Sequence, residues 1–230
     1  MPVTAICYPC TLPHIQQISN HFIIVDSMTQ PSDQVKAQSE IGADEKQQNR
    51  RELRHFLKQQ RTAISVEDKR QWDQAIARHL RSLVFDLKPE TLAVFWPIQS
   101  EPDLLACFYE LHQSGLRLAL PIVLAKSQPL QFVAWQPGQA MEKDAYGIAM
   151  PVDRSRELVP DCIIAPCVGF NQQNFRLGYG GGFYDRTLAK YRNAHSIGVA
   201  YEICRAQFAA DTYDIALHTI VTEAARYSAT

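Results

Sequence analysis

Apolar residues recur along this chain at helical spacing in some segments and as short continuous runs in others. The pattern from Lys46 to Ile64 predicts a helix. The sequence Ser65-Val66-Glu67-Asp68 resembles a capping box with Asp in place of Glu, and it predicts the start of a second helix. The apolar positions of the second helix are Trp72, Ile76, Leu80 and Leu83. Pro89 ends that segment.

Continuous apolar runs then alternate with further helical segments. The predicted strands cover residues 91–96, 116–120, 130–135, 162–165 and 197–201. Further helices are predicted from Pro102 to near Gly115 and over residues 184–191. This alternation predicts an α/β fold with a mostly parallel sheet flanked by helices, in a three-layer Rossmann-like architecture.

A cluster of glycines follows the buried strand at residues 162–165. Four of the ten glycines fall within five residues, namely Gly178, Gly180, Gly181 and Gly182. Bare amides next to a helix N-terminus form a natural phosphate cradle, and the carboxyl ends of parallel strands are where ligands gather. Arg176 could add a forked cation, and Asp185 could hold a divalent metal. A glycine-rich surface turn with charged flanks is the alternative interpretation.

Residues 169–186 read GFNQQNFRLGYGGGFYDR. This stretch resembles the signature of the 5-formyltetrahydrofolate cyclo-ligase family, GxxFDxxGxRLGYGGGYYDR. From Arg176 to Arg186 only Phe183 departs from it. Asn171 stands at the position of an aspartate and lacks its charge, whereas Asn174 replaces a glycine and still tolerates the left-handed turn.

The resemblance implies roles for the residues of the glycine loop. The loop residues expected to bind ATP are Arg176, Leu177, Gly178, Tyr179, Gly180, Gly181, Gly182, Phe183 and Tyr184. Those also expected to contact the folate are Tyr179, Gly180, Gly181, Gly182 and Phe183. Arg176 and Tyr184 are the expected catalytic residues, and Asp185 is an expected magnesium ligand.

Basic residues form a stripe on the first predicted helix, at Arg50, Arg54, Lys58 and Arg61. On spacing alone, a solvated helix face is the favoured interpretation. The family begins with a K-x-x-x-R helix whose two cations contact ATP. By resemblance, Arg54 and Arg50 are therefore expected ATP contacts, with Arg50 standing in place of the lysine.

Two further segments resemble the family. The segment from Phe95 to Asp103 matches a strand-to-helix turn in which Glu101 corresponds to a folate-binding glutamate. Trp96 is expected either to line the folate pocket or simply to pack in the core. The segment from Tyr213 to Glu223 resembles HDxxxDxIVTE, which makes Asp214 an expected second magnesium ligand; Tyr213 and His218 depart from that pattern.

The resemblance implies an ATP-dependent cyclo-ligase that converts 5-formyltetrahydrofolate into 5,10-methenyltetrahydrofolate and releases ADP and phosphate, with ATP and Mg²⁺ as cofactors. Because several family positions are replaced, a relative that binds folate or nucleotide without efficient turnover is the alternative. An isomerase or transferase on the same scaffold is a third hypothesis, disfavoured because the glycine loop is a site motif. A nucleic-acid-binding module is disfavoured because aromatic residues do not interleave with the basic stripe.

Composition narrows the remaining choices. The chain has 230 residues, a formal net charge of −1 and a 46% hydrophobic share. We expect a single domain over residues 46–230, preceded by a disordered extension over residues 1–45, and Met28 is a second candidate start. Six cysteines, of which Cys7 and Cys10 form an incidental CxxC, favour reduced thiols. We expect a cytoplasmic monomer that binds small molecules and neither nucleic acid nor membrane.

Overall fold

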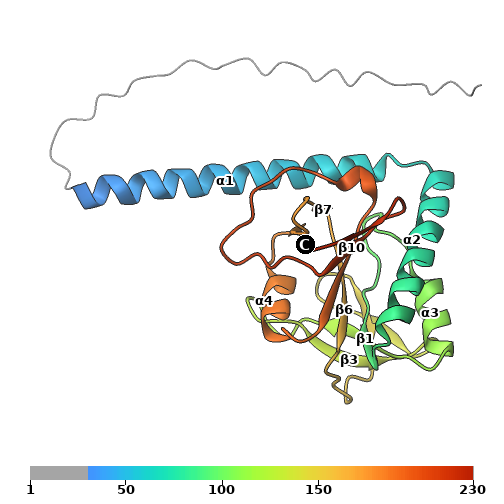
Figure 1. Ribbon diagram of the computed structural model, residues 1–230. Helices are drawn as coiled ribbons and strands as arrows, with labels where there is room; N and C mark the ends of the chain where they lie inside the picture. The colour runs from blue at the N-terminus through green and yellow to red at the C-terminus, as the bar shows by residue number, and fades with distance from the viewer. Residues whose placement is uncertain (1–30, 230) are drawn as a thin grey trace, which may run out of the picture. The chain divides into compact units, whose positions relative to one another are not determined.

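A seven-stranded sheet in the order β11-β10-β9-β6-β1-β2-β3 forms the centre of the fold (Figure 1). The computed structural model describes the backbone of residues 31–229 and the side chains of residues 46–229. The five parallel strands are β1 (Thr91–Ala93), β2 (Arg117–Ile122), β6 (Cys162–Pro166), β9 (His195–Val199) and β10 (Thr219–Val221). The antiparallel strands β3 (Gln131–Trp135) and β11 (Arg226–Ser228) form the two edges.

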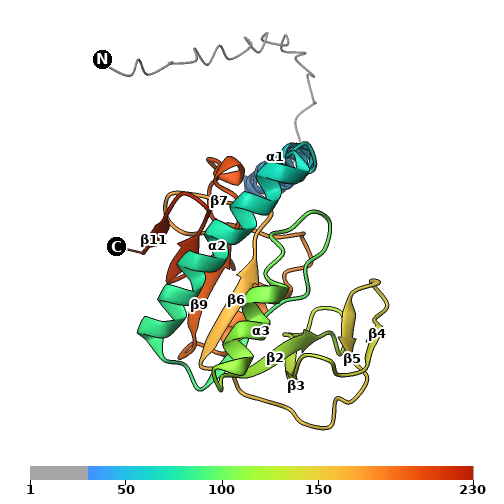
Figure 2. The ribbon, with the colours of Figure 1, turned by 90° about the vertical axis from the view of Figure 1, so that its right-hand side faces the viewer.

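Helices cover both faces of the sheet. Helix α2 (Val66–Leu87) and helix α3 (Leu105–Gln113) lie on one face, and helix α4 (Phe183–Lys190) lies on the other (Figures 1 and 2). The crossover β1-α3-β2 runs toward one edge and β6-α4-β9 toward the opposite edge. Right-handed crossovers, which are the rule for parallel strands, place helices on opposite faces when they run toward opposite edges. The predicted α/β class, with a mostly parallel sheet flanked by helices, is confirmed.

The first helix is longer than predicted. Helix α1 spans Pro31–Thr62, and proline is well tolerated at a first helical position, where its missing N–H would be unpaired in any case. Residues 31–45 are therefore helical, where a disordered extension was predicted, because their Gln, Ala, Glu and Lys residues favour a helix. The remainder of that prediction, including Met28, Cys7 and Cys10, lies outside the described residues. Residues 43–230 form one structural unit.

The capping signal at the start of α2 is confirmed. Ser65 has extended backbone angles, and its Oγ accepts a hydrogen bond from the Asp68 N–H at 3.0 Å. The Asp68 carboxylate accepts a bond from Ser65 Oγ at 2.7 Å. Asp is one methylene shorter than the Glu of a standard capping box, so this bond to the hydroxyl is the contact that its side chain makes here.

The core lies on both faces of the central strands. Leu92, Val94 and Ile163 are fully buried, as expected for strands covered by helices on either side. Cys107, Cys162, Cys167 and Cys204 are buried and free. Burial raises the pKa of the Cys167 thiol to about 12, so this side chain stays protonated.

Two short hairpins, a 3₁₀ turn and the strands β10 and β11 were not predicted. Strands β4 (Met141–Lys143) and β5 (Ala149–Pro151) form one hairpin, and β7 (Gly169–Phe170) and β8 (Arg176–Leu177) form the other. The 3₁₀ turn spans Glu202–Cys204. No helix within residues 31–229 has the length and apolar character needed to cross a bilayer.

Candidate active site

The candidate site lies where the order of the sheet reverses. Strands β1 and β6 are parallel neighbours, and the chain leaves them toward opposite edges. In open α/β sheets the crevice beyond the carboxyl ends of two such strands is the usual ligand site. The segment after β1 leads to Glu101, and the segment after β6 leads to the glycine loop. Both motifs found in the sequence therefore meet at this switch point.

The glycine loop connects the β7–β8 hairpin to α4. Gly180 and Gly182 have φ values of +97° and +64°, which residues with a side chain rarely adopt. Gly182 is the N-cap of α4 and provides no side-chain cap, so its backbone leaves amide donors of the first helical turn for another partner. This is the arrangement expected of an anion-binding loop.

Arg176 lies beneath this loop. Its side chain is 5% exposed, and Nη2 lies 2.9 Å from Asp185 Oδ1. Its guanidinium carbon lies 5.3 Å from the centre of the Tyr184 ring, within cation–π distance. A Cβ atom at position 178 would lie 2.4 Å from Arg176 Nη1, so a side chain there would displace this guanidinium.

The basic stripe of α1 faces the same loop. Arg54 Nε donates to the Gly178 carbonyl at 2.8 Å, and the Lys58 ammonium lies 5.9 Å from the centre of the Tyr179 ring. Arg50 and Arg61 are buried. The interpretation of the stripe as a solvated helix face is therefore wrong, because tertiary contacts, which spacing does not reveal, cover it.

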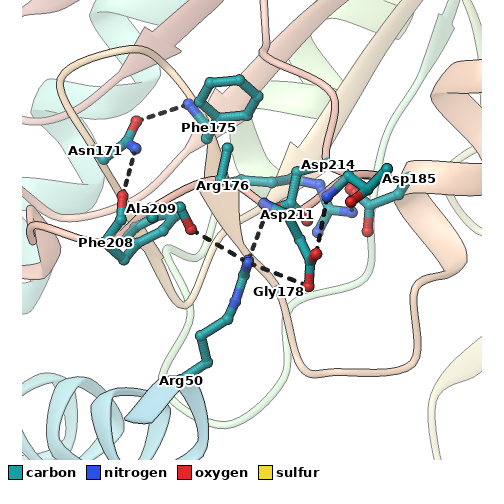
Figure 3. Close-up of polar contacts among 12 residues, drawn as sticks. Arg50, Asn171, Phe175, Arg176, Gly178, Asp185, Phe208, Ala209, Asp211 and Asp214 are labelled. Atoms are coloured by element: carbon teal, nitrogen blue, oxygen red, sulfur yellow. Dashed lines mark hydrogen bonds and ion pairs between the residues drawn. The ribbon is translucent and has the colours of Figure 1, made fainter. Parts of the chain in front are cut away.

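Arg50 is fixed by the segment that precedes β10. Its Nη2 donates to Asp214 Oδ2 at 2.8 Å, and its guanidinium lies 5.5 Å from the centre of the Phe208 ring (Figure 3). Burial, and secondly the charge of Arg50, lower the pKa of the Arg54 guanidinium from its ordinary value. These basic groups together create a site where an anion would be stabilised.

The two expected metal ligands are each paired with an arginine, Asp185 with Arg176 and Asp214 with Arg50 (Figure 3). Within residues 46–229 no group of three or more His, Cys, Asp or Glu side chains could enclose a metal ion. Mg²⁺ commonly takes only one or two protein carboxylates, and phosphate oxygens and water complete its shell. The residues present therefore fit a magnesium ion that arrives with a polyphosphate.

Glu101 is buried at the other side of the crevice. Its Oε1 accepts a hydrogen bond from Tyr179 Oη at 2.6 Å, and its Oε2 accepts one from the Ile98 N–H at 2.9 Å. Burial raises the pKa of the Glu101 carboxyl, and the bond from Tyr179 and the charge of Arg61 oppose that shift. Each carboxylate oxygen retains a second acceptor position for a ligand.

Arg61 belongs to the basic stripe of α1, but the sequence indicated no functional role for it. Its Nη2 donates to the Gln99 carbonyl at 2.7 Å and to Tyr179 Oη at 2.9 Å. The only sequence signal was its position seven residues after Arg54, on the same helix face. Trp96 is partly buried and packs edge-to-face on Trp135 at a centroid distance of 6.1 Å, so its proposed contact with folate stays a prediction.

The two asparagines of the motif have structural partners. Asn174 has a φ of +59°, which confirms that it supplies the left-handed turn. Asn171 accepts from the backbone N–H groups of Gln173 and Phe175, and its amide donates to the Phe208 carbonyl (Figure 3).

The two replaced positions near the C-terminus have different surroundings. Tyr213 is 84% exposed. His218 Nδ1 lies 2.7 Å from Ser196 Oγ, near the amino end of β9, whereas the crevice lies beyond the carboxyl ends of the strands.

Comparison with known proteins gives consistent matches. The model of the 5-formyltetrahydrofolate cyclo-ligase family matches residues 46–223. A relative from Mycoplasma pneumoniae with the name 5-formyltetrahydrofolate cyclo-ligase is 30% identical over 179 residues, covering 74% of this chain and 96% of the relative. A relative of the same name from Escherichia coli is 29% identical over 176 residues, with coverages of 73% and 96%.

Solved structures agree with these matches. The 5,10-methenyltetrahydrofolate synthetase of Aquifex aeolicus superposes with a TM-score of 0.69 at 28% identity, covering 78% of this chain and 92% of that one. The 5,10-methenyltetrahydrofolate synthetase of Mycoplasma pneumoniae gives a TM-score of 0.62 at 28% identity, with coverages of 76% and 98%.

Proposed function

The chain belongs to the 5-formyltetrahydrofolate cyclo-ligase family, and we propose that the crevice between β1 and β6 carries out the reaction of that family. The reaction is the ATP-dependent closure of 5-formyltetrahydrofolate to 5,10-methenyltetrahydrofolate, with release of ADP and phosphate. The observation that carries this proposal is a group of three arginines beside a glycine loop that faces a buried carboxylate. Arg54 donates to the Gly178 carbonyl of the loop, Arg176 lies beneath Gly178, and Arg50 lies close enough to Arg54 for its charge to lower the pKa of that guanidinium.

Ring closure requires that the formyl oxygen be converted into a good leaving group. The formyl oxygen attacks the γ-phosphorus of ATP, the bond to the β-phosphate oxygen breaks, and ADP leaves. N10 of the folate then attacks the activated carbon, loses its proton, and the carbon–oxygen bond breaks to release phosphate. For phosphoryl transfer the protein mainly has to position the two substrates and neutralise the charge of the phosphates.

ATP would be held by the basic groups and the loop. Arg50 and Arg54 would contact its phosphates from α1, and Arg176 would do so from beneath the loop. The buried and partly buried positions of these guanidiniums support that role, because water screens their charges little there. The loop residues from Leu177 to Tyr184 would supply backbone donors.

Magnesium would be held by Asp185 and Asp214 together with phosphate oxygens. When bound, the ion would neutralise charge that develops on the transferring phosphoryl group. Because each carboxylate is already paired with an arginine, each is fixed in position for this role.

Tyr184 is proposed to donate a hydrogen bond to the formyl oxygen or to the transferring phosphoryl group. Burial raises the pKa of its phenol well above the ordinary value, so the hydroxyl keeps its proton and remains a donor. The nearby Arg176 charge opposes that shift only in part.

The folate would lie against Glu101, whose carboxylate would accept N–H donors of the pterin ring. Trp96, Tyr179, Phe183 and the three glycines at 180–182 would line the same pocket. The enclosed position of Glu101, which is 2% exposed, supports recognition of a polar edge of the ligand. We also expect the enzyme to act as a monomer and without nucleic acid.

The test follows absorbance at the methenyltetrahydrofolate band, with purified protein, 5-formyltetrahydrofolate, magnesium and ATP. We expect the band to grow only when ATP is present, and to be lost in Arg176→Ala and Asp185→Ala. Near wild-type turnover in both variants would contradict the residue roles. A flat trace with wild-type protein, while calorimetry still detects ATP or folate binding, would favour the binding protein without turnover.

A further inference from the structure

Arg61 lies in the last turn of α1 and is almost completely buried, with 2% of its surface exposed. Its Nη2 bonds both the Gln99 carbonyl and Tyr179 Oη. Its Nε and Nη1 have no hydrogen-bond partner among residues 46–229, and no carboxylate within those residues forms an ion pair with it. Burying an arginine charge without an ion-pair partner costs free energy, which the two hydrogen bonds of Nη2 offset only in part.

The contacts of Arg61 fix the direction of a hydrogen-bond chain. A guanidinium is only a donor, so Tyr179 Oη must accept from it, and the tyrosine proton is thereby directed to Glu101 Oε1. Each bond in such a chain polarises the next one. The Glu101 carboxylate is thus held by a relay that begins on α1 and passes through the glycine loop.

The same guanidinium also holds the loop before Glu101. Gln99 and Ser100 have φ values of +46° and +61°, a conformation that residues with side chains adopt rarely. The turn closes through the Glu101 N–H to the Ile98 carbonyl at 2.9 Å. Arg61 binds the carbonyl of one of its two left-handed residues.

We infer that Arg61 is a positioning residue of the folate subsite, which orients Glu101 through Tyr179 and through the Gln99 carbonyl. It acts through these groups and not on the reacting atoms. This inference rests on the proposed function, because it takes Glu101 as the group that receives the folate.

The test compares four single variants and one double variant, all full-length, with the wild type. Arg61→Met removes the charge and its bonds, Arg61→Lys keeps the charge without the planar fork, and Tyr179→Phe removes the middle of the relay. Arg51→Met is the matched control, because Arg51 is an exposed arginine of the same helix. Calorimetry gives the Kd of 5-formyltetrahydrofolate and of ATP separately, and the absorbance assay gives kcat and both KM values.

We expect Arg61→Met and Tyr179→Phe each to raise the Kd and KM of the folate at least about tenfold, the effect of losing a hydrogen bond to a charged group. The ATP constants should change by less than about twofold in both variants, because the proposed contacts of Arg50 and Arg54 and the backbone donors of the loop, including that of residue 179, remain. Arg61→Lys should fall between wild type and Arg61→Met, and Arg51→Met should match the wild type. The double variant of Arg61→Met with Tyr179→Phe should have a folate Kd no higher than that of the more impaired single variant.

An unchanged folate Kd in a folded Arg61→Met protein would overturn the inference. So would equal losses of folate and ATP affinity, which would indicate general damage. If Arg61→Met does not fold, Arg61→Lys carries the test, and wild-type folate affinity in that variant overturns the inference. A wild-type protein that binds folate but never forms the methenyl band refutes the proposed reaction, while the calorimetric comparison still decides the role of Arg61.

Discussion

At the scale of single residues, Asn171 uses both ends of its side-chain amide inside the hairpin. Its Oδ1 accepts from the N–H groups of Gln173 and Phe175, each at 3.0 Å. Its Nδ2 donates to the Phe208 carbonyl at 3.0 Å. Phe208 in turn packs on the guanidinium of Arg50, so Asn171 connects the motif to the segment that holds an ATP-binding candidate. This arrangement makes the amide a structural group of this chain.

We predict that Asn171→Asp destabilises the protein and does not raise turnover. The carboxylate would keep the two accepted bonds but would set a second oxygen against the Phe208 carbonyl in a position that is 3% exposed. Losing a buried donor in this way costs about 1–3 kcal/mol of unfolding free energy. Urea unfolding and the absorbance assay measure the two effects.

Gln172→Glu is the matched control, because it adds the same charge at the exposed neighbouring position. It should leave the unfolding free energy within about 0.5 kcal/mol of wild type, as is usual for surface changes. A marked gain of turnover in Asn171→Asp would instead mean that the missing charge had weakened the enzyme. That result would support the alternative hypothesis that the protein binds folate or nucleotide without efficient turnover.

At the scale of elements, the sequence predicted the long helices and the central strands because each has a clear periodicity or a continuous apolar run. The family resemblance assigned both Glu101 and the glycine loop to the folate, and the structure brings them together because both follow parallel neighbouring strands. The hairpins β4–β5 and β7–β8 were missed because strands of two or three residues are too short to show a period. The relay from Arg61 to Glu101 joins residues 61, 179 and 101, and local patterns do not encode such distant pairs.

The N-cap of α2 gives a test at this scale. We predict that Ser65→Ala lowers the unfolding free energy by about 1 kcal/mol, because the Asp68 N–H loses the Ser65 Oγ acceptor. Urea unfolding measures this loss, and kcat and both KM values should stay at wild-type levels.

Ser82→Ala is the control for that substitution, since Ser82 is an exposed residue in the interior of α2. It should be neutral or slightly stabilising, because alanine is the better helix former. Equal losses in the two variants would show that the cap contributes nothing specific.

At the scale of the whole molecule, a pair of histidines couples stability to pH. The rings of His195 and His218 stack at a centroid distance of 4.7 Å, and His195 Nε2 lies 3.3 Å from Thr219 Oγ1. Burial, and secondly His218, lower the pKa of His195 from its ordinary value. The unfolded chain therefore binds this proton first as the pH falls, and folding stability declines from about pH 6.5 downward through the folded pKa.

We predict that wild-type protein loses more unfolding free energy than His195→Gln between pH 7.5 and pH 5.5. Urea unfolding at both pH values measures the difference, which should be absent above pH 7.5, where His195 is neutral in both states. The turnover of the variant should stay at the wild-type level, because His195 begins β9 at the end opposite to the crevice. Parallel pH profiles for the two proteins would contradict the prediction.

Ligand binding supplies the last test, because it stabilises the entire folded unit. A ligand present at about 100 times its Kd adds about 2.7 kcal/mol to the unfolding free energy. If Asp185 and Asp214 hold magnesium beside the phosphates, ATP with magnesium must raise the melting temperature more than the same ATP with a chelator. Asp185→Asn should remove most of that difference and still respond to ATP, since the substitution leaves Arg50 and Arg54, the proposed phosphate contacts, in place. An equal magnesium effect in Asp185→Asn and wild type would mean that Asp185 does not hold the ion, and that its ion pair with Arg176 serves only to position the arginine.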